Sequence, residues 1–112
     1  MRRTPLILDF ELSPFWTIAW YQSYWVSRDE RSGWWRLYER RDYGEEGRRP
    51  RVQITAARFT ELDQLADAVV SGVVQSGIGG VWLADATDAR LEPVLDRLRE
   101  ELRARDIYVD DE

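Results

Sequence analysis

The sequence contains no cysteine, no histidine and no lysine. The missing cysteines exclude disulfide bonds, thiolate zinc sites and thiol nucleophiles. The missing histidines exclude a Ser-His-Asp triad, imidazole metal ligands and the commonest general base. Any chemistry would therefore depend on carboxylates, hydroxyls, tyrosines, arginines or a metal ion that the carboxylates hold.

The chain also has no long apolar run. The apolar stretch near its start is interrupted by Asp9, Glu11 and Pro14, so it does not fit a signal peptide. No run approaches the roughly 18 uncharged apolar residues that a membrane span needs. We therefore expect a cytoplasmic protein without a membrane partner. Its 112 residues predict a single domain, residues 1–112.

The charge is distributed unevenly. Residues 28–58 carry nine arginines against six acidic residues, whereas residues 59–112 carry five arginines against thirteen acidic residues. A polyanion would be attracted to the first of these segments and repelled by the second. Only the middle of the chain is therefore suited to a phosphate-rich partner.

The first half of the sequence predicts three antiparallel strands, because its apolar and polar residues alternate and polar turns separate the runs. These strands are residues 6–12, 15–27 and 34–43. Residues 44–50 predict an exposed loop. Residues 51–56 fit either a short further strand or the lead-in to a helix.

The second half changes to helical spacing. Thr60 is the predicted N-cap of a first helix that ends at Gly77, with Asp63 at the capping-box position. Residues 81–86 predict a strand, and residues 88–105 contain a second helix. We expect that helix to start near Glu92, because Pro93 is tolerated only in the first turn. The apolar stripes of the two helices are Leu62, Leu65, Ala66, Val69 and Val73, then Leu91, Leu95, Leu98 and Leu102.

A last strand at residues 107–109 completes the predicted fold. It is an α+β domain with a mixed sheet, in which a three-stranded antiparallel meander is followed by α-β-α-β. The mixed sheet is expected because strand-helix-strand units prefer parallel crossovers.

The third predicted strand has one face rich in aromatic residues and arginine. Alternation places Trp34, Arg36, Tyr38 and Arg40 on that face, and Trp35 with Leu37 in the core. The second strand adds Tyr21 and Trp25 if Leu8 and Phe10 face the core, or Trp20 and Tyr24 in the opposite register.

Such a face predicts a binding surface, because bases stack on aromatic rings and guanidinium groups contact phosphates. We expect single-stranded nucleic acid or a nucleoprotein as the partner. The same residue types are enriched in protein-binding hot spots, so a protein-binding inhibitor or accessory subunit is the alternative. Cross-strand packing, or a homodimer through the sheet face, would also account for the pattern.

Residues 60–91 resemble the ribonuclease H pattern. Glu61 and Leu62 open a helix, and the strand that follows ends in Asp85, with the hydroxyl residue Thr87 close by. In that family three antiparallel strands precede the helix, and the first of them carries a metal-binding aspartate, here Asp9. The resemblance implies that Asp9, Glu61 and Asp85 hold Mg²⁺ or Mn²⁺ for phosphodiester cleavage. Otherwise Glu61 is a helix-dipole partner and Asp85 a turn residue.

From these observations we predict a small, non-catalytic binding protein without a cofactor, and a metal-dependent nuclease as the alternative. The predicted binding residues are Tyr21, Trp25, Trp34, Arg36, Tyr38 and Arg40.

Overall fold

The computed structural model describes the backbone of residues 2–12, 18–45, 51–77, 79–83 and 88–111. Side chains are described for residues 22–41, 52–77, 79–83 and 88–110.

In the described part of the chain, six strands form one mixed sheet in the order β4-β3-β2-β1-β5-β6. The strands β1 to β4 are an antiparallel meander, β5 pairs antiparallel with β1, and β6 pairs parallel with β5. This arrangement confirms the α+β class and the mixed sheet. The strands are β1 (Arg2–Leu12), β2 (Ile18–Arg28), β3 (Trp35–Glu45), β4 (Arg51–Phe59), β5 (Gly80–Leu83) and β6 (Tyr108–Asp111).

The meander has a fourth strand of full length. Residues 51–56, which fitted either a strand or a helix lead-in, belong to the nine-residue β4. Its β-branched residues Val52, Ile54 and Thr55 favour a strand. β3 in turn continues to Glu45, into the segment predicted as a loop. The ribonuclease H resemblance, which rests on residues 60–91 and on the order of the elements, stays a prediction.

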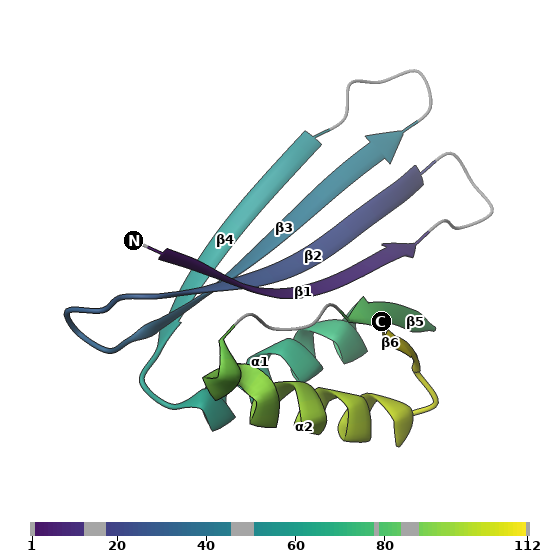
Figure 1. Ribbon diagram of the computed structural model, residues 1–112. Coiled ribbons are helices and arrows are strands. Elements are labelled where there is room, and N and C mark those ends of the chain that lie inside the picture. Colours follow the sequence, from purple (N-terminus) through teal and green to yellow (C-terminus); the bar gives the residue numbers. More distant parts are fainter. Residues whose placement is uncertain (1, 13–17, 46–50, 78, 84–87, 112) are drawn as a thin grey trace.

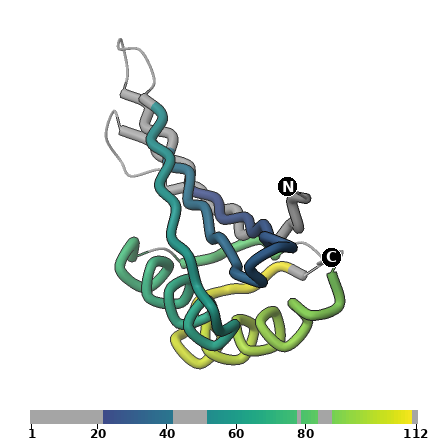
Figure 2. The backbone as a smooth tube through the Cα atoms, turned by 90° about the vertical axis from the view of Figure 1, so that its left-hand side faces the viewer, coloured from purple at the N-terminus to yellow at the C-terminus, as the bar shows by residue number. Residues whose placement is uncertain are grey.

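Both helices lie on the same face of the sheet (Figures 1 and 2). They are α1 (Leu62–Gln75) and α2 (Glu92–Arg103), and the short 3-10 helix η1 (Ala89–Leu91) precedes α2. Their predicted apolar stripes pack against the sheet and are buried, except that Leu62 is only partly buried. The sheet side of this core is formed by Tyr24, Val26, Trp35 and Leu37 of β2 and β3, and by Val81, Leu83 and Val109 of β5 and β6.

The ends of the helices follow local sequence signals with one correction. The N-cap of α1 is Glu61 rather than Thr60; Glu61 is extended and makes no side-chain capping bond. Gly77, with φ +66°, follows the helix end as predicted, because glycine adopts this left-handed conformation without strain. Pro93 lies in the first turn of α2, and this confirms the predicted start.

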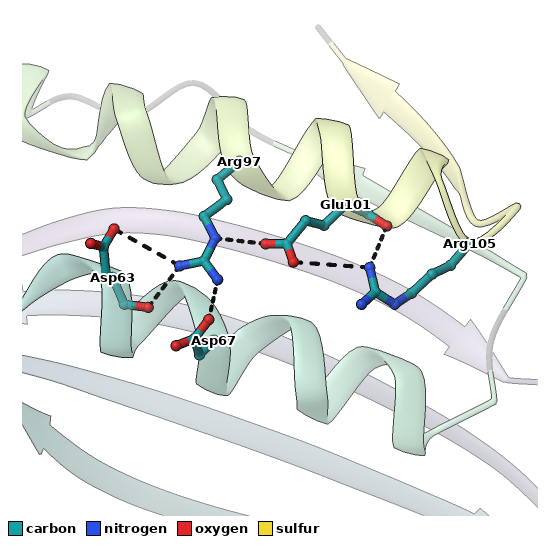
Figure 3. Close-up of polar contacts among 5 residues, drawn as sticks. All are labelled: Asp63, Asp67, Arg97, Glu101 and Arg105. Carbon is teal, nitrogen blue, oxygen red and sulfur yellow. Dashed lines mark hydrogen bonds and ion pairs between the residues drawn. The ribbon is translucent and has the colours of Figure 1, made fainter.

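An ion-pair network joins the two helices (Figure 3). Arg97 of α2 donates to the backbone carbonyl of Asp63 on α1 at 2.9 Å and to the Asp67 carboxylate. Its Nε also donates to Glu101 at 2.6 Å, and Glu101 faces Arg105. One guanidinium group thus connects both helices, and its three directions of donation suit this role.

The hairpin between β2 and β3 determines which residues of β3 face the core. The Asp29 amide donates to the Trp34 carbonyl at 2.9 Å, and Gly33 adopts φ +76° in the turn. Trp34 therefore lies in the turn, and the strand starts at Trp35 instead of residue 34. Trp35 and Leu37 are 4% and 6% exposed, so their predicted place in the core is confirmed.

No helix in the described part of the chain is long and apolar enough to cross a membrane.

Candidate interaction surface

The sheet has a second face that no helix of the described residues covers (Figure 1). Tyr24 and Val26 of β2 are buried against the helices. Successive side chains of a strand point to opposite faces, so Trp25 lies on the uncovered face. On β3 the same alternation with Trp35 and Leu37 places Arg36, Tyr38 and Arg40 there. We call this face the outer face.

Trp25 and Tyr38 form an aromatic pair on the outer face. They are directly opposite each other in the register of β2 and β3. Their ring centroids are 5.1 Å apart and their planes differ by only 7°. Both side chains are half-buried. This cross-strand stack is the arrangement expected when two aromatic residues share a sheet face.

Trp34 and Arg58 extend the same surface towards the β2–β3 turn. The Arg58 guanidinium carbon lies 5.5 Å from the centroid of the Trp34 ring. Arg58 is directly opposite Arg36 in the register of β3 and β4. Trp34 is 40% exposed. We define the outer cluster as Trp25, Trp34, Arg36, Tyr38, Arg40 and Arg58.

The structure places the other predicted residues as follows. Tyr21 belongs to β2, where its backbone pairs with Asp42, but its side chain lies outside the described part. The sequence left open which face of the second strand points to the core. In the structure Tyr24 is in the core, where it is 2% exposed, and Trp25 is on the outer face. The backbone of Trp20 is in β2 as well, and its side chain is likewise not described.

Arg58 and Trp82 also belong to the outer face, although sequence reasoning did not select them. Trp82 of β5 alternates with the buried Val81 and Leu83. That alternation is visible in the sequence and would have placed Trp82. Arg58 could have been placed on this face only if the predicted fourth strand had been extended to residue 58.

At the hairpin end of the core, two guanidinium groups pack on the buried Trp35 ring. The guanidinium carbons of Arg28 and Arg90 lie 5.4 Å and 5.2 Å from its centroid. Asp88 positions Arg90 by accepting from its Nε at 2.9 Å and from its backbone amide at 3.0 Å. The bonds from Arg90 hold the pKa of the Asp88 carboxyl below its usual value.

A buried polar network lies on the core side of the sheet, and sequence reasoning did not identify it. Glu39 accepts from Gln22 at 2.8 Å, from Arg41 at 2.7 Å and from the Tyr24 hydroxyl. Ser76 of the α1 C-cap donates to Gln22 at 2.9 Å. Burial and the bond to Glu39 raise the pKa of Tyr24, so its phenol stays protonated. The sequence feature that could have revealed this network is Glu39, a carboxylate at a position of β3 that alternation assigns to the core face.

Next to this network is a cavity of about 270 Å³ between the sheet and α1. Its lining is mainly apolar, and Glu39 and Tyr24 of the polar network are among the residues that form it. The residues that line it are Tyr24, Leu37, Glu39, Thr55, Ala56, Ala57, Phe59 and Ala68.

The acids of the nuclease alternative are only partly described. The backbone of Asp9 is in β1, paired with Ser23 on one side and Trp82 on the other. Glu61 is exposed at the start of α1, and Asp85 lies outside the described residues. Among the residues whose side chains are described, no group of three acidic residues could hold a metal ion. The metal site with Mg²⁺ or Mn²⁺ stays a prediction.

Comparisons with protein-family models, with curated proteins and with solved structures found no match to this chain.

Proposed function

We propose that the chain is a non-catalytic binding protein that engages a protein partner through its outer face. The observation that carries this proposal is the outer cluster, which gathers three aromatic residues and three arginines on the sheet face that no described helix covers. Tryptophan, tyrosine and arginine are the residues that dominate protein-binding hot spots. None of the three arginines is buried, so they are accessible to a partner.

The geometry of the rings favours a protein over single-stranded nucleic acid. Trp25 and Tyr38 stack on each other, so each ring has one face already in contact with the chain itself. The Trp34 ring has Arg58 over one of its faces. Base binding needs free ring faces on which successive bases stack, and these contacts reduce the number available. A protein surface, in contrast, can pack against ring edges as well as faces.

The charges in and around the outer cluster indicate which charges the partner surface carries. Arg36, Arg40 and Arg58 favour a protein surface that carries carboxylates, since guanidinium groups bind these in bidentate geometry. The neighbouring strand β1 carries Asp9 and Glu11, and these acids oppose a continuous phosphate backbone. An inhibitor or accessory subunit fits these properties, and we place its action in the cytoplasm.

The proposal is tested with four forms of the protein: wild type, Trp34→Ala, Arg36→Ala and a matched control, Arg105→Ala. Arg105 is an exposed arginine just after the end of α2, on the face of the sheet that the helices cover (Figure 3). Each form is immobilised and incubated with the same lysate of the source organism, and retained proteins are quantified at low and high salt. Binding of a labelled oligothymidine is measured in parallel.

We expect one protein to be retained by wild type and by Arg105→Ala, and lost with Trp34→Ala and Arg36→Ala. Because aromatic contacts contribute part of its affinity, this interface should weaken less at high salt than binding to a phosphate backbone would. If no protein distinguishes wild type from Arg36→Ala, the proposal is wrong. Salt-sensitive oligothymidine binding that Arg36→Ala abolishes would instead support the nucleic-acid expectation.

A further inference from the structure

β4 forms an exposed edge of the sheet, since β3 is its only neighbour among the described strands. Residues 52–57 of β4 are uncharged, contain no proline or glycine, and are all exposed. Val52 and Ile54 are 54% and 57% exposed. An edge strand of this kind offers backbone hydrogen-bonding groups together with apolar side chains, and it therefore favours pairing with another strand.

The opposite edge of the sheet is built differently. β6 has only four residues and ends in Asp110 and Asp111, which Glu112 follows in the sequence. Short length and charge are two ways in which proteins prevent edge strands from pairing. The sheet therefore has one protected edge, at β6, and one edge at β4 whose central residues carry no such protection.

We propose that β4 pairs antiparallel with β4 of a second copy of this chain, about a twofold axis that passes through Ile54. In this register Ile54 is opposite itself, Val52 is opposite Ala56, and Gln53 is opposite Thr55. The axis is perpendicular to the sheet, so the two outer faces become one continuous face. The proposal is independent of the proposed function, because the residues that form the edge contact are not those of the outer cluster.

The sequence of β4 is the reason for choosing a second copy as the occupant. In the proposed register the apolar side chains of the outer face meet apolar ones, and the amide of Gln53 meets the hydroxyl of Thr55 on the other face. The uncharged run lies between Arg51 and Arg58, and the proposed register places Arg51 opposite Ala57. The twofold axis sends the two Arg58 residues to opposite ends of the paired strands, so no like charges oppose each other.

The cavity beside β4 lies on the helix side of the proposed contact. Thr55 lines this cavity and is directly opposite Glu39 in the register of β3 and β4. In the proposed dimer, Gln53 of the second copy takes the place on the other side of Thr55. A second copy therefore extends the helix-side surface of the sheet at the point where α1 leaves β4 exposed.

The first experiment measures the oligomeric state by sedimentation equilibrium for wild type, Ile54→Lys and Val74→Lys. Val74 is the matched control, because it is 43% exposed on α1 and receives the same change. We expect a wild-type dimer and no effect of Val74→Lys. Ile54→Lys should weaken association about tenfold or more, because two like charges would then be directly opposite each other. Circular dichroism checks that both variants are folded.

The second experiment uses the absence of cysteine from the chain. With Ile54→Cys, two thiols would face each other across the axis, with Cβ atoms about 4.5–5.5 Å apart, close to the span of a disulfide. We expect oxidation to yield a covalent dimer with Ile54→Cys and far less with Val74→Cys.

Several results would overturn the proposal. A wild type that remains monomeric up to submillimolar concentration would exclude the dimer. Equal dissociation by Ile54→Lys and Val74→Lys would show that the interface is not at β4. Cross-linking of Thr55→Cys in preference to Ile54→Cys would refute the proposed register.

Discussion

Gly72 provides the sharpest test of the buried network. It lies inside α1, where replacing glycine by alanine ordinarily stabilises a helix by about 1 kcal/mol. A Cβ atom at this position, however, would collide with the Tyr24 hydroxyl and would lie 3.2 Å from Tyr24 Cζ. The hydroxyl cannot easily move away, because it donates to Glu39 and accepts from Gln22 at 2.9 Å.

We therefore expect Gly72→Ala to destabilise the protein, contrary to its helix propensity. Displacing a tightly packed side chain costs about 1–3 kcal/mol. Complete loss of the hydrogen bond from the Tyr24 hydroxyl to the Glu39 carboxylate would cost about 1.5–3 kcal/mol more. The structure can relax in part, and the higher helix propensity of alanine offsets some of the cost. We therefore expect the free energy of unfolding to fall by about 2 kcal/mol.

A double-mutant cycle with Tyr24→Phe isolates this contact. Removing the hydroxyl removes the colliding atom, so Gly72→Ala should be neutral or slightly stabilising in the Tyr24→Phe background. The coupling free energy should be about 2 kcal/mol. The assay is urea unfolding followed by tryptophan fluorescence. Ser71→Ala, at an exposed position one residue earlier, is the control and should change the unfolding free energy by less than about 0.5 kcal/mol. The reasoning is refuted if Gly72→Ala stabilises the protein, or if its effect is the same in both backgrounds.

Three further predictions concern other parts of the fold. Trp35→Ala should lower the unfolding free energy by roughly 3–5 kcal/mol, whereas Trp34→Ala should cost less than about 1 kcal/mol; urea melts that rank them the other way would refute our assignment of the core face. Arg97→Lys should cost about 1 kcal/mol and Arg99→Lys, whose ion pair with Asp96 stays within α2, less than about 0.5 kcal/mol; equal losses would mean that the link between the helices contributes nothing. The lowered pKa of Asp88 gives a stabilisation that is complete above its unfolded-state pKa of about 3.9 and is lost as the pH falls through the folded-state pKa. In unfolding measurements from pH 7 to pH 2, Asp88→Asn should lose part of this acid dependence, and an unchanged pH profile would contradict the role of the Arg90 pair.

Local sequence patterns correctly predicted those elements in which apolar residues recur with the period of the helix or strand and are buried on one face. The leucines of α2 recur at helical spacing, and Leu91, Leu95, Leu98 and Leu102 are all fully buried. Pro93 indicated the start of α2 because its ring is compatible only with the first turn. The alternation of Trp35 and Leu37 with polar residues likewise identified the core face of β3.

The features that were missed depend on contacts between distant segments. Short β-branched runs such as residues 51–56 do not reveal their partner strand, and β4 became recognisable only through its pairing with β3. The Glu39 network joins β2, β3 and the end of α1, and Ser76 and Gln22 are 54 positions apart. No local pattern encodes such a meeting. The prediction for Thr60 failed although its local signal was good. Thr60 directly follows β4, which continues to Phe59, and the N-cap is the next residue, Glu61.

The absence of lysine has a structural counterpart in how the arginines are used. Arg28 and Arg90 lie over the buried Trp35 ring, which a planar guanidinium can stack on more closely than an ammonium group. Arg97 contacts two residues of α1 and one of α2, a geometry that requires several fixed donors on one side chain. Arg58 over Trp34 repeats the first arrangement, but at the surface. The first two pairs cover an aromatic ring that belongs to the core, whereas the pair at Trp34 is exposed on both sides and adds little to stability. This difference in stability is consistent with the binding role that we propose for the outer face.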